Sequence, residues 1–487
     1  MKNVHRFTCT FRSFRLETQQ TMIRRFSHCS FREIQCKMST TCRIAVIQMT
    51  STSDKLRNRS KCQSLLEKAK SYGAQAAFLP EAFDFIGESA QQTVELAESS
   101  LNDGTISFYQ SLAAKLNMSL SLGGFHEALE NNQKLSNTHI FISSKGQIIG
   151  RYAKAHLFDV EIPERGIRLK ESDYVQAGRK IASPVPLLEE QDQFQVGLAI
   201  CYDLRFPQLA MALCQRGANI LTFPSAFTVA TGSAGHWSTL LKARAIENQC
   251  YVVAAAQTGR HNPKRTSYGH ACVIDPWGTV IAECPEGEEM VVAELSLDKI
   301  EDVKKNMPVD RHRRNDLYAL ATADNFLVAE DEHDDDQKNF KFADIDIPGK
   351  CVVFASRCSL VIVNRKPVVP GHLLVIPKSP ARRVQDLDVD QVTDLFLTVQ
   401  TAQKLSESFF QAESSTLSVQ DGPDAGQTVA HVHVHVLPRK PGDFANNDDI
   451  YNELSTHDKG DNVQWRSYEE MSEEASRLRQ HFRKMPS

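Results

Sequence analysis

The 487-residue chain lacks the features that mark membrane, nucleic-acid-binding and disulfide-rich proteins. It has no run of about 18 apolar residues, so the sequence predicts no membrane-spanning helix. Its formal net charge of -4 offers no basic excess for nucleic acid. Its 12 cysteines include no CxxC pair and follow no apolar secretory segment, which favours reduced thiols and a cytoplasmic location. We therefore expect neither a membrane nor a nucleic acid among its partners.

Composition and length divide the chain into four regions. Residues 1–41 form a basic leader with six arginines, two lysines and only two acids in its first 40 positions. That composition fits a mitochondrial transit peptide or, equally, an unstructured extension. Residues 42–322 form a first domain and residues 339–487 a second. Between them, residues 323–338 contain six acids from Glu330 to Asp336, which predicts a solvated acidic linker.

The first domain alternates short apolar, β-branched runs with helical stretches. This alternation predicts an α/β sandwich. Strands are expected in residues 43–49, 76–83, 195–203, 218–226 and 250–258, and helices in residues 60–72, 106–116, 208–216 and 236–248.

The second domain has the pattern of a small α+β unit of ordinary domain size. One long helix, residues 389–411, lies among several strands, and a last helix is expected near residues 469–483. The strands are expected in residues 351–356, 359–364, 371–378 and 430–438.

The segment AHVHVHVLPRK, residues 430–440, places His431, His433 and His435 at alternate positions. Because successive strand side chains point to opposite faces, the histidines share one face and the valines between them face the core. Three imidazoles together indicate either a metal site or a nucleophile with helpers. Carboxylates and thiolates that would complete a zinc site are scarce nearby, and a glycine-containing loop, residues 422–426, suits phosphate binding. The nucleophile is favoured, and the metal site stays open.

The segments QTVAHVHVHVLPR and NRKPVVPGHLLVIPK resemble the histidine-triad superfamily, and within it the Fhit branch. The resemblance implies a homodimerising antiparallel sheet that cleaves diadenosine triphosphate to AMP and ADP. It also implies that His433 attacks the α-phosphorus and is transiently adenylylated. No resident cofactor is implied, and any divalent metal would arrive with the nucleotide. By position, His435 binds phosphate, His431 and His372 orient the nucleophile, and Asn364, Gln420, Gly426, Gln427, Thr428 and Val429 contact phosphate and ribose.

In the first domain, three chemically active residues stand at the ends of apolar runs. Glu81 ends FLPE, Lys154 follows GRYA, and Cys201 passes from a strand into a helix in VGLAICYDLRF. Charged groups at strand ends of an α/β sheet lie where active sites collect. We also expect helix N-terminal amides to stabilise a Cys201 thiolate.

These segments, with GGFHE, RAIENQCYVVAAAQTG and GHACVIDPWGTVIAE, resemble the nitrilase superfamily of carbon–nitrogen hydrolases. The resemblance implies a four-layer αββα sandwich, subunit pairing, and a Glu81–Lys154–Cys201 triad. The implied substrate is a small ω-amide of the deaminated-glutathione type. A further acid is usual in the family. Glu171 is our candidate for it, with Glu161 and Glu127 as alternatives.

The order of the two modules resembles that of nitrilase–Fhit fusion proteins, and it predicts a bifunctional hydrolase assembled as a homotetramer. A different hypothesis is a nucleotide-occupied signalling platform with slow turnover, carried on an oligomeric nitrilase-like scaffold. Turnover numbers would separate the two hypotheses, since tight binding with very slow release favours the platform.

Overall fold

The computed structural model describes residues 40–98, 104–129, 134–162, 167–189, 191–314, 317–318, 320, 322, 339–456 and 465–485. The predicted acidic linker and all but the last two residues of the predicted leader lie outside these ranges. Within the described ranges, no helix combines the length and apolar character needed to cross a bilayer.

The first domain contains an eight-stranded sheet built around β1 (Thr41–Met49). β1 pairs in parallel with β2 and β12 and in antiparallel with β16. The other members follow outward on either side. They are β2 (Ala76–Leu79), β3 (Ser119–Ala128), β4 (Leu135–Ile142), β5 (Ile148–Ala153), β12 (Ala256–Asn262), β13 (Arg265–Tyr268) and β16 (Glu289–Ser296).

The second sheet of this domain has six strands, and its central strands β9, β10 and β11 are parallel. A short antiparallel hairpin forms a separate two-stranded sheet. The sheet order is β15 (Val280–Glu283), β14 (Cys272–Ile274), β11 (Tyr251–Ala254), β10 (Ile220–Thr222), β9 (Gln191–Leu198) and β8 (Val185–Leu188). The hairpin is β6 (Asp159–Ile162) with β7 (Ile167–Lys170).

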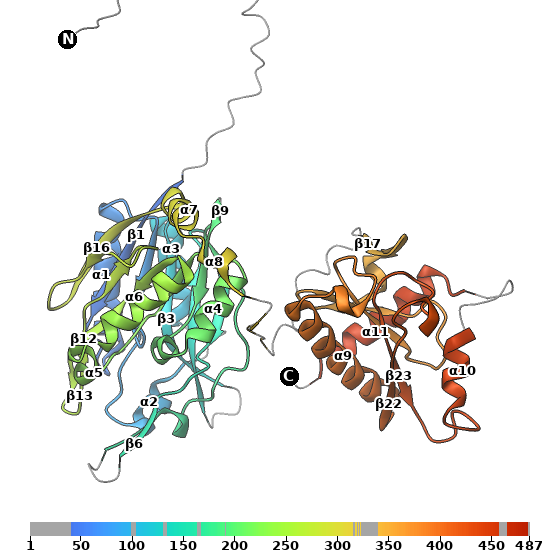
Figure 1. The fold of residues 1–487 in the computed structure, drawn as a ribbon. Helices are drawn as coiled ribbons and strands as arrows, with labels where there is room; N and C mark the ends of the chain where they lie inside the picture. Colours follow the sequence, from blue (N-terminus) through green and yellow to red (C-terminus); the bar gives the residue numbers. More distant parts are fainter. Residues whose placement is uncertain are drawn as a thin grey trace, which may run out of the picture. The chain divides into compact units, whose positions relative to one another are not determined.

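Alternate side chains of β1 pack into two different hydrophobic cores. Ile44 and Val46 pack in the same core as Val196 and Ile220 of the second sheet. Ala45 and Ile47 face the opposite way, into a core shared with the helices. The outer helices are α1 (Lys55–Ser71) and α3 (Gly104–Leu116) on the first sheet, and α4 (Pro207–Gln215) and α6 (His236–Asn248) on the second. This confirms the αββα sandwich (Figure 1).

The first domain also contains shorter helices. They are α2 (Ala90–Leu96), α5 (Val229–Ser233), α7 (Leu297–Asn306) and α8 (Val309–His312).

The second domain is built on a five-stranded antiparallel sheet, which confirms the α+β prediction. The long helix α9 (Val389–Phe410) packs on this sheet, with α11 (Tyr468–Phe482) beside it (Figure 1). The strand order is β19 (Val352–Ala355), β20 (Ser359–Val363), β21 (Leu373–Pro377), β23 (Val434–Arg439) and β22 (Ser414–Val419). The hairpin β17 (Asn339–Phe342) with β18 (Ile345–Pro348) and helix α10 (Asp449–Thr456) complete the domain.

Two element boundaries differ from the sequence prediction for local reasons. Helix α1 begins at Lys55 rather than Ser60, because the Asp54 carboxylate accepts the backbone N–H of Arg57 and caps the first turn. The histidine strand begins only at Val434. The expectation that all three histidines lie along one strand is therefore wrong.

Candidate active sites

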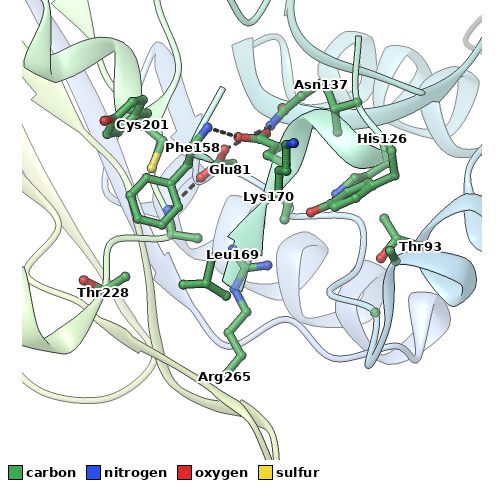
Figure 2. A pocket seen from close by; sticks show the side chains of 18 of the residues that line it. Glu81, Thr93, His126, Asn137, Phe158, Leu169, Lys170, Cys201, Thr228 and Arg265 are labelled. Carbon is green, nitrogen blue, oxygen red and sulfur yellow. Dashed lines mark hydrogen bonds between the residues drawn. The ribbon is translucent and has the colours of Figure 1, made fainter. Parts of the chain in front are cut away.

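The nitrilase-like domain holds a cavity of about 620 Å³, and Glu81, Lys154 and Cys201 all line it. Each residue follows a strand closely: β2 ends at Leu79, β5 at Ala153 and β9 at Leu198. The strand ends therefore bring together side chains that are far apart in the sequence (Figure 2). This is the placement that the sequence pattern predicted.

Lys154 is the buried hub of this cluster. Its Nζ lies 2.9 Å from Glu81 Oε1 and 2.9 Å from Glu171 Oε2. Burial alone would raise the pKa of the Glu81 carboxyl, but the ammonium charge and its hydrogen bond outweigh burial and lower that pKa to about 2. The same two carboxylates outweigh the effect of burial on Lys154 and raise its pKa well above the ordinary value. At neutral pH the cluster is thus one ammonium between two carboxylates.

The structure places one of the three candidate acids at this cluster. Glu171 contacts Lys154 and also accepts the backbone N–H of Phe158 at 2.8 Å. Glu127 is occupied elsewhere, by Thr138 and Arg151. Glu161 is exposed on β6.

Cys201 begins a short 3₁₀ helix, residues 201–205, in a strained backbone conformation with φ of 43°. Its thiol hydrogen-bonds to Glu81, which Figure 2 shows beside it. Burial, followed by the negative charge of Glu81, raises the pKa of the Cys201 thiol. The expected thiolate, stabilised by helix amides, is therefore wrong for the resting protein. The Cys201 thiol is therefore neutral and lies beside an ionised Glu81 carboxylate.

Asp203 fixes the turn that presents Cys201. Its carboxylate is fully buried and accepts Tyr152 Oη at 2.9 Å, the Ile200 amide at 2.9 Å and His156 Nδ1 at 2.7 Å. The His156 ring in turn stacks on Phe206, with 3.7 Å between ring centroids. These bonds tie the turn to the first sheet.

The sequence analysis did not single out Asn137 and Gln257, which hold Glu81 in place. Asn137 Nδ2 donates to Glu81 at 3.0 Å and to Glu171 at 3.2 Å. Gln257 Nε2 donates to the Glu81 carbonyl at 3.0 Å. A Cβ at Gly124, whose φ is +69°, would lie 2.7 Å from Glu81 Cγ, so glycine permits this approach. Asn137 is one of four consecutive polar residues in the buried strand β4, so polarity alone does not single it out in the sequence.

In the second domain, hydrogen bonds assign the proton positions of the histidines. His433 Nδ1 lies 2.8 Å from the His431 carbonyl, so Nδ1 carries the proton and Nε2 holds an unprotonated lone pair. His372 Nδ1 accepts the Val368 amide at 3.2 Å, so its Nε2–H donates to His435 Nδ1 at 2.8 Å. His435 therefore carries its proton on Nε2. The ring centroids of His433 and His435 lie 5.0 Å apart, so the two rings are neighbours.

The backbone carbonyl of His431 accepts the hydrogen bond from His433, and both nitrogens of the His431 ring are hydrogen-bonded to other backbone groups. His431 Nε2 donates to the Pro377 carbonyl at 2.9 Å, and Nδ1 accepts the Ala343 amide at 3.1 Å. Burial lowers the pKa of His431. With both nitrogens engaged, this ring is not placed to ligate a metal. Within the described ranges, no cluster of three or more His, Cys, Asp or Glu side chains is arranged to hold a metal ion.

The predicted phosphate and ribose contacts lie around the triad. Asn364 Nδ2 is 3.2 Å from His372 Nε2. The Gln427 side chain closes the loop by accepting the Gly422 amide at 2.8 Å and donating to the His431 carbonyl at 3.3 Å. Gly426 has a φ of 86°, and its neighbour Gln420 is half-buried. Thr428 is exposed and Val429 is half-buried.

Comparison with known proteins identifies both domains. Residues 43–305 match the carbon–nitrogen hydrolase family, and residues 346–442 match the HIT domain family. The chain is 45% identical, over 89% of its length and 95% of the relative's, to the "nitrilase and fragile histidine triad fusion protein NitFhit" of Caenorhabditis elegans. The chain belongs to the NitFhit family.

A solved structure and a single-domain relative agree with this membership. The crystal structure of the C. elegans NitFhit protein matches with a TM-score of 0.79 at 42% identity, covering 91% of this chain and 99% of that one. The deaminated glutathione amidase of Mus musculus is 49% identical over 56% of this chain and 84% of its own. The NitFhit chain thus joins a nitrilase-type amidase domain to a HIT hydrolase domain.

Proposed function

We propose that the first domain hydrolyses a small ω-amide of the deaminated-glutathione type through a Cys201 thioester. The observation that carries this proposal is the hydrogen-bonded line from Cys201 through Glu81 to Lys154 inside one cavity. The 49% identity to a protein named deaminated glutathione amidase supports the substrate type.

The proton positions suggest how this reaction proceeds. Because the resting thiol is neutral, Glu81 takes its proton as the sulfur attacks the amide carbon. Lys154 Nζ stabilises the developing oxyanion. Glu81 then gives the proton to the leaving ammonia, and the acyl group stays on sulfur. A water molecule, deprotonated by Glu81, hydrolyses the thioester, releases the acid and restores the thiol.

The amidase proposal is tested on the full chain with deaminated glutathione. Wild-type protein should release ammonia, and stopping the reaction early should leave an acyl adduct on the Cys201 peptide in mass spectrometry. The Cys201→Ala variant should release none. Equal ammonia release by that variant would overturn the role of Cys201.

For the second domain, we propose hydrolysis of diadenosine triphosphate through an adenylyl-His433 intermediate. The carrying observation is that hydrogen bonds at Nδ1 leave His433 with a lone pair on Nε2 and the neighbouring His435 ring with a proton on Nε2. His433 attacks the α-phosphorus, ADP leaves, and His435 donates to a phosphate oxygen as negative charge develops. Water then displaces AMP from the imidazole.

This proposal is tested by trapping with labelled diadenosine triphosphate and peptide mapping. The label should sit on His433. The His433→Asn variant should bind the nucleotide but not hydrolyse it, and His481→Asn, a partly exposed histidine on α11, is the matched control. Hydrolysis at near wild-type rate by the His433 variant would exclude the role.

We also propose that the chain assembles as a homotetramer through two different surfaces. Edge strand β22 exposes Leu417 and Val419, and the amidase domain exposes Ile246 and Trp277. Exposed apolar groups and an unpaired strand edge are features of subunit interfaces. Sedimentation equilibrium should give four times the chain mass, and a monomer at micromolar concentration would exclude the assembly.

A further inference from the structure

A second pair of ionisable side chains lies in the amidase cavity, apart from the Cys201 cluster. His126 Nδ1 is 3.0 Å from Asp84 Oδ1 and 3.3 Å from Oδ2, and the His126 backbone amide donates to Oδ2 at 3.1 Å. The Asp84 side chain is 0% exposed, while His126 is 11% exposed and lines the cavity. Figure 2 shows His126 on the side of the view away from Cys201.

This arrangement fixes which edge of the imidazole faces the cavity. A carboxylate at neutral pH only accepts hydrogen bonds, so Nδ1 of His126 carries a proton toward Asp84. The Nε2 edge is then the one presented to a ligand. The ring packs on Phe85, with 4.5 Å between centroids, which holds its orientation. The catalytic steps proposed above do not use this oriented imidazole.

The charges around the rest of the cavity favour an anionic ligand. Outside the catalytic cluster, the lining residues include four cations and two anions. These are Lys170, Arg205, Lys264 and Arg265 against Glu88 and Asp173. Arg265 comes from the start of β13 and reaches into the cavity (Figure 2). It has no ion-pair partner among the residues that the structure describes. Burial raises the pKa of Glu81, and the charge of Arg265 adds to the larger effects of Lys154 and Cys201 that lower it.

We propose that His126, oriented by Asp84 and assisted by the charge of Arg265, binds a free carboxylate at the remote end of the amide substrate. A carboxylate at Nε2 would place negative charge on both sides of the ring, which stabilises the imidazolium and its second N–H donor. The amidase would then select ω-amides that also carry a carboxylate. This inference rests on the proposed amidase function.

Two substrates of matched length test the selection on the full chain. Succinamate carries an amide and a carboxylate, and butyramide has a methyl group in place of the carboxylate. In His126→Ala, kcat/KM for succinamate should fall about tenfold or more, mainly through KM, as expected for loss of a charged hydrogen bond. For butyramide it should change less than about twofold. His270→Ala, outside this cavity, is the matched control and should change neither. Equal losses on both substrates, or no loss on either, would overturn the inference.

Binding of succinate separates this inference from the amidase proposal, because succinate has no amide to hydrolyse. Calorimetry should show succinate binding to wild type, and about tenfold weaker binding to His126→Ala. Arg265→Gln, on an exposed position, should weaken binding in the same direction and serves if the His126 variant does not fold. If wild type binds succinate but hydrolyses no amide, the amidase proposal fails while the carboxylate site stands. Unchanged binding in both variants, or none in wild type, would reject the site.

Discussion

His372 Nε2 lies 2.8 Å from His435 Nδ1, and the Val368 amide sets the direction of that hydrogen bond. His372 is fully buried and comes from the turn before β21, whereas His435 lies in β23. Through this contact a residue outside the HVHVHV segment decides which nitrogen of His435 carries the proton. The proton on His435 Nε2 thus depends on His372, which lies outside the HVHVHV segment.

The His372–His435 hydrogen bond leads to the first prediction. His372→Ala should lower the rate of adenylylation of His433 about tenfold to a hundredfold, because His435 loses its fixed tautomer. His372→Gln keeps an N–H donor and should recover part of that rate. Single-turnover measurements with labelled diadenosine triphosphate separate this step from binding, which should change little. Equal rates in the Ala and Gln variants would contradict a positioning role.

The buried ion cluster predicts a pH-dependent stability. The pKa of Glu81 in the folded state, about 2, is below its ordinary value. Glu81 therefore contributes stability above about pH 4.5, and this is lost as pH falls toward 2. Lys154→Met removes the cation and leaves two buried carboxylates, which should cost about 3–5 kcal/mol at pH 7. Burial would then raise the pKa of Glu81, so the variant should gain stability as pH falls.

Guanidinium-induced unfolding at pH 7.5 and pH 4.5 tests whether the Lys154→Met variant gains stability as pH falls. The difference in unfolding free energy between wild type and Lys154→Met should shrink at the lower pH. The double variant Lys154→Met, Glu171→Gln removes one of the two like charges and should recover part of the loss at pH 7.5. A difference that grows on acidification would be opposite to this reasoning.

Cys201 reactivity should depend on Glu81. Cys201, Cys214 and Cys358 are the partly exposed cysteines among those described, so they form a matched set for alkylation. Iodoacetamide should label Cys201 first, although its thiol pKa is raised, because Glu81 accepts the proton as sulfur attacks. Glu81→Gln should remove this preference, and Glu171→Gln should keep it. Peptide mass spectrometry measures the labelling, and equal rates at the three sites in wild type would count against catalysis.

The sequence predicted the residues that end strands and missed those inside them. Glu81, Lys154 and Cys201 each follow an apolar run. β2 and β5 belong to one sheet and β9 to the other, and the residues that follow these strands line one cavity. Asn137 and His126 lie within β4 and β3, where no local signal marks them. Their partners, Glu81 and Asp84, are distant in the chain, so only the assembled sheet makes those contacts.

The histidine segment shows the limit of a period-2 pattern. Alternation of histidine and valine extends through His431, and the valines are buried as predicted. The strand nevertheless starts at Val434, because the Val432 amide bonds to the Ala381 carbonyl outside the sheet. That bend allows the His431 carbonyl to accept His433 Nδ1. Sequence periodicity does not report such a competing hydrogen bond.

The side-chain amide of Asn137 lies between Glu81 and Glu171, and we expect its Ala and Asp variants to differ in activity. Asn137→Ala removes the donor shared by Glu81 and Glu171 and should lower kcat for the amide about tenfold. Asn137→Asp adds a third carboxylate to the same space, so repulsion should lower kcat further and reduce thermal stability. Steady-state kinetics and thermal melts compare the two variants. A more active Asp variant would show that the donated hydrogen bonds do not matter.

Asp203 provides the last prediction, because it holds the turn of Cys201 against the segment from Tyr152 to His156. Asp203→Asn keeps the size of the side chain but replaces one acceptor oxygen by a donor, facing the Ile200 amide, His156 and Tyr152. At least one buried donor then loses its acceptor, which should cost about 1–3 kcal/mol of stability. The strained Cys201 backbone should relax, and kcat should fall about a hundredfold with little change in KM. Tyr152→Phe removes one of these bonds and should retain most activity. If Asp203→Asn unfolds at a lower temperature yet keeps its kcat, the turn does not depend on this carboxylate for catalysis.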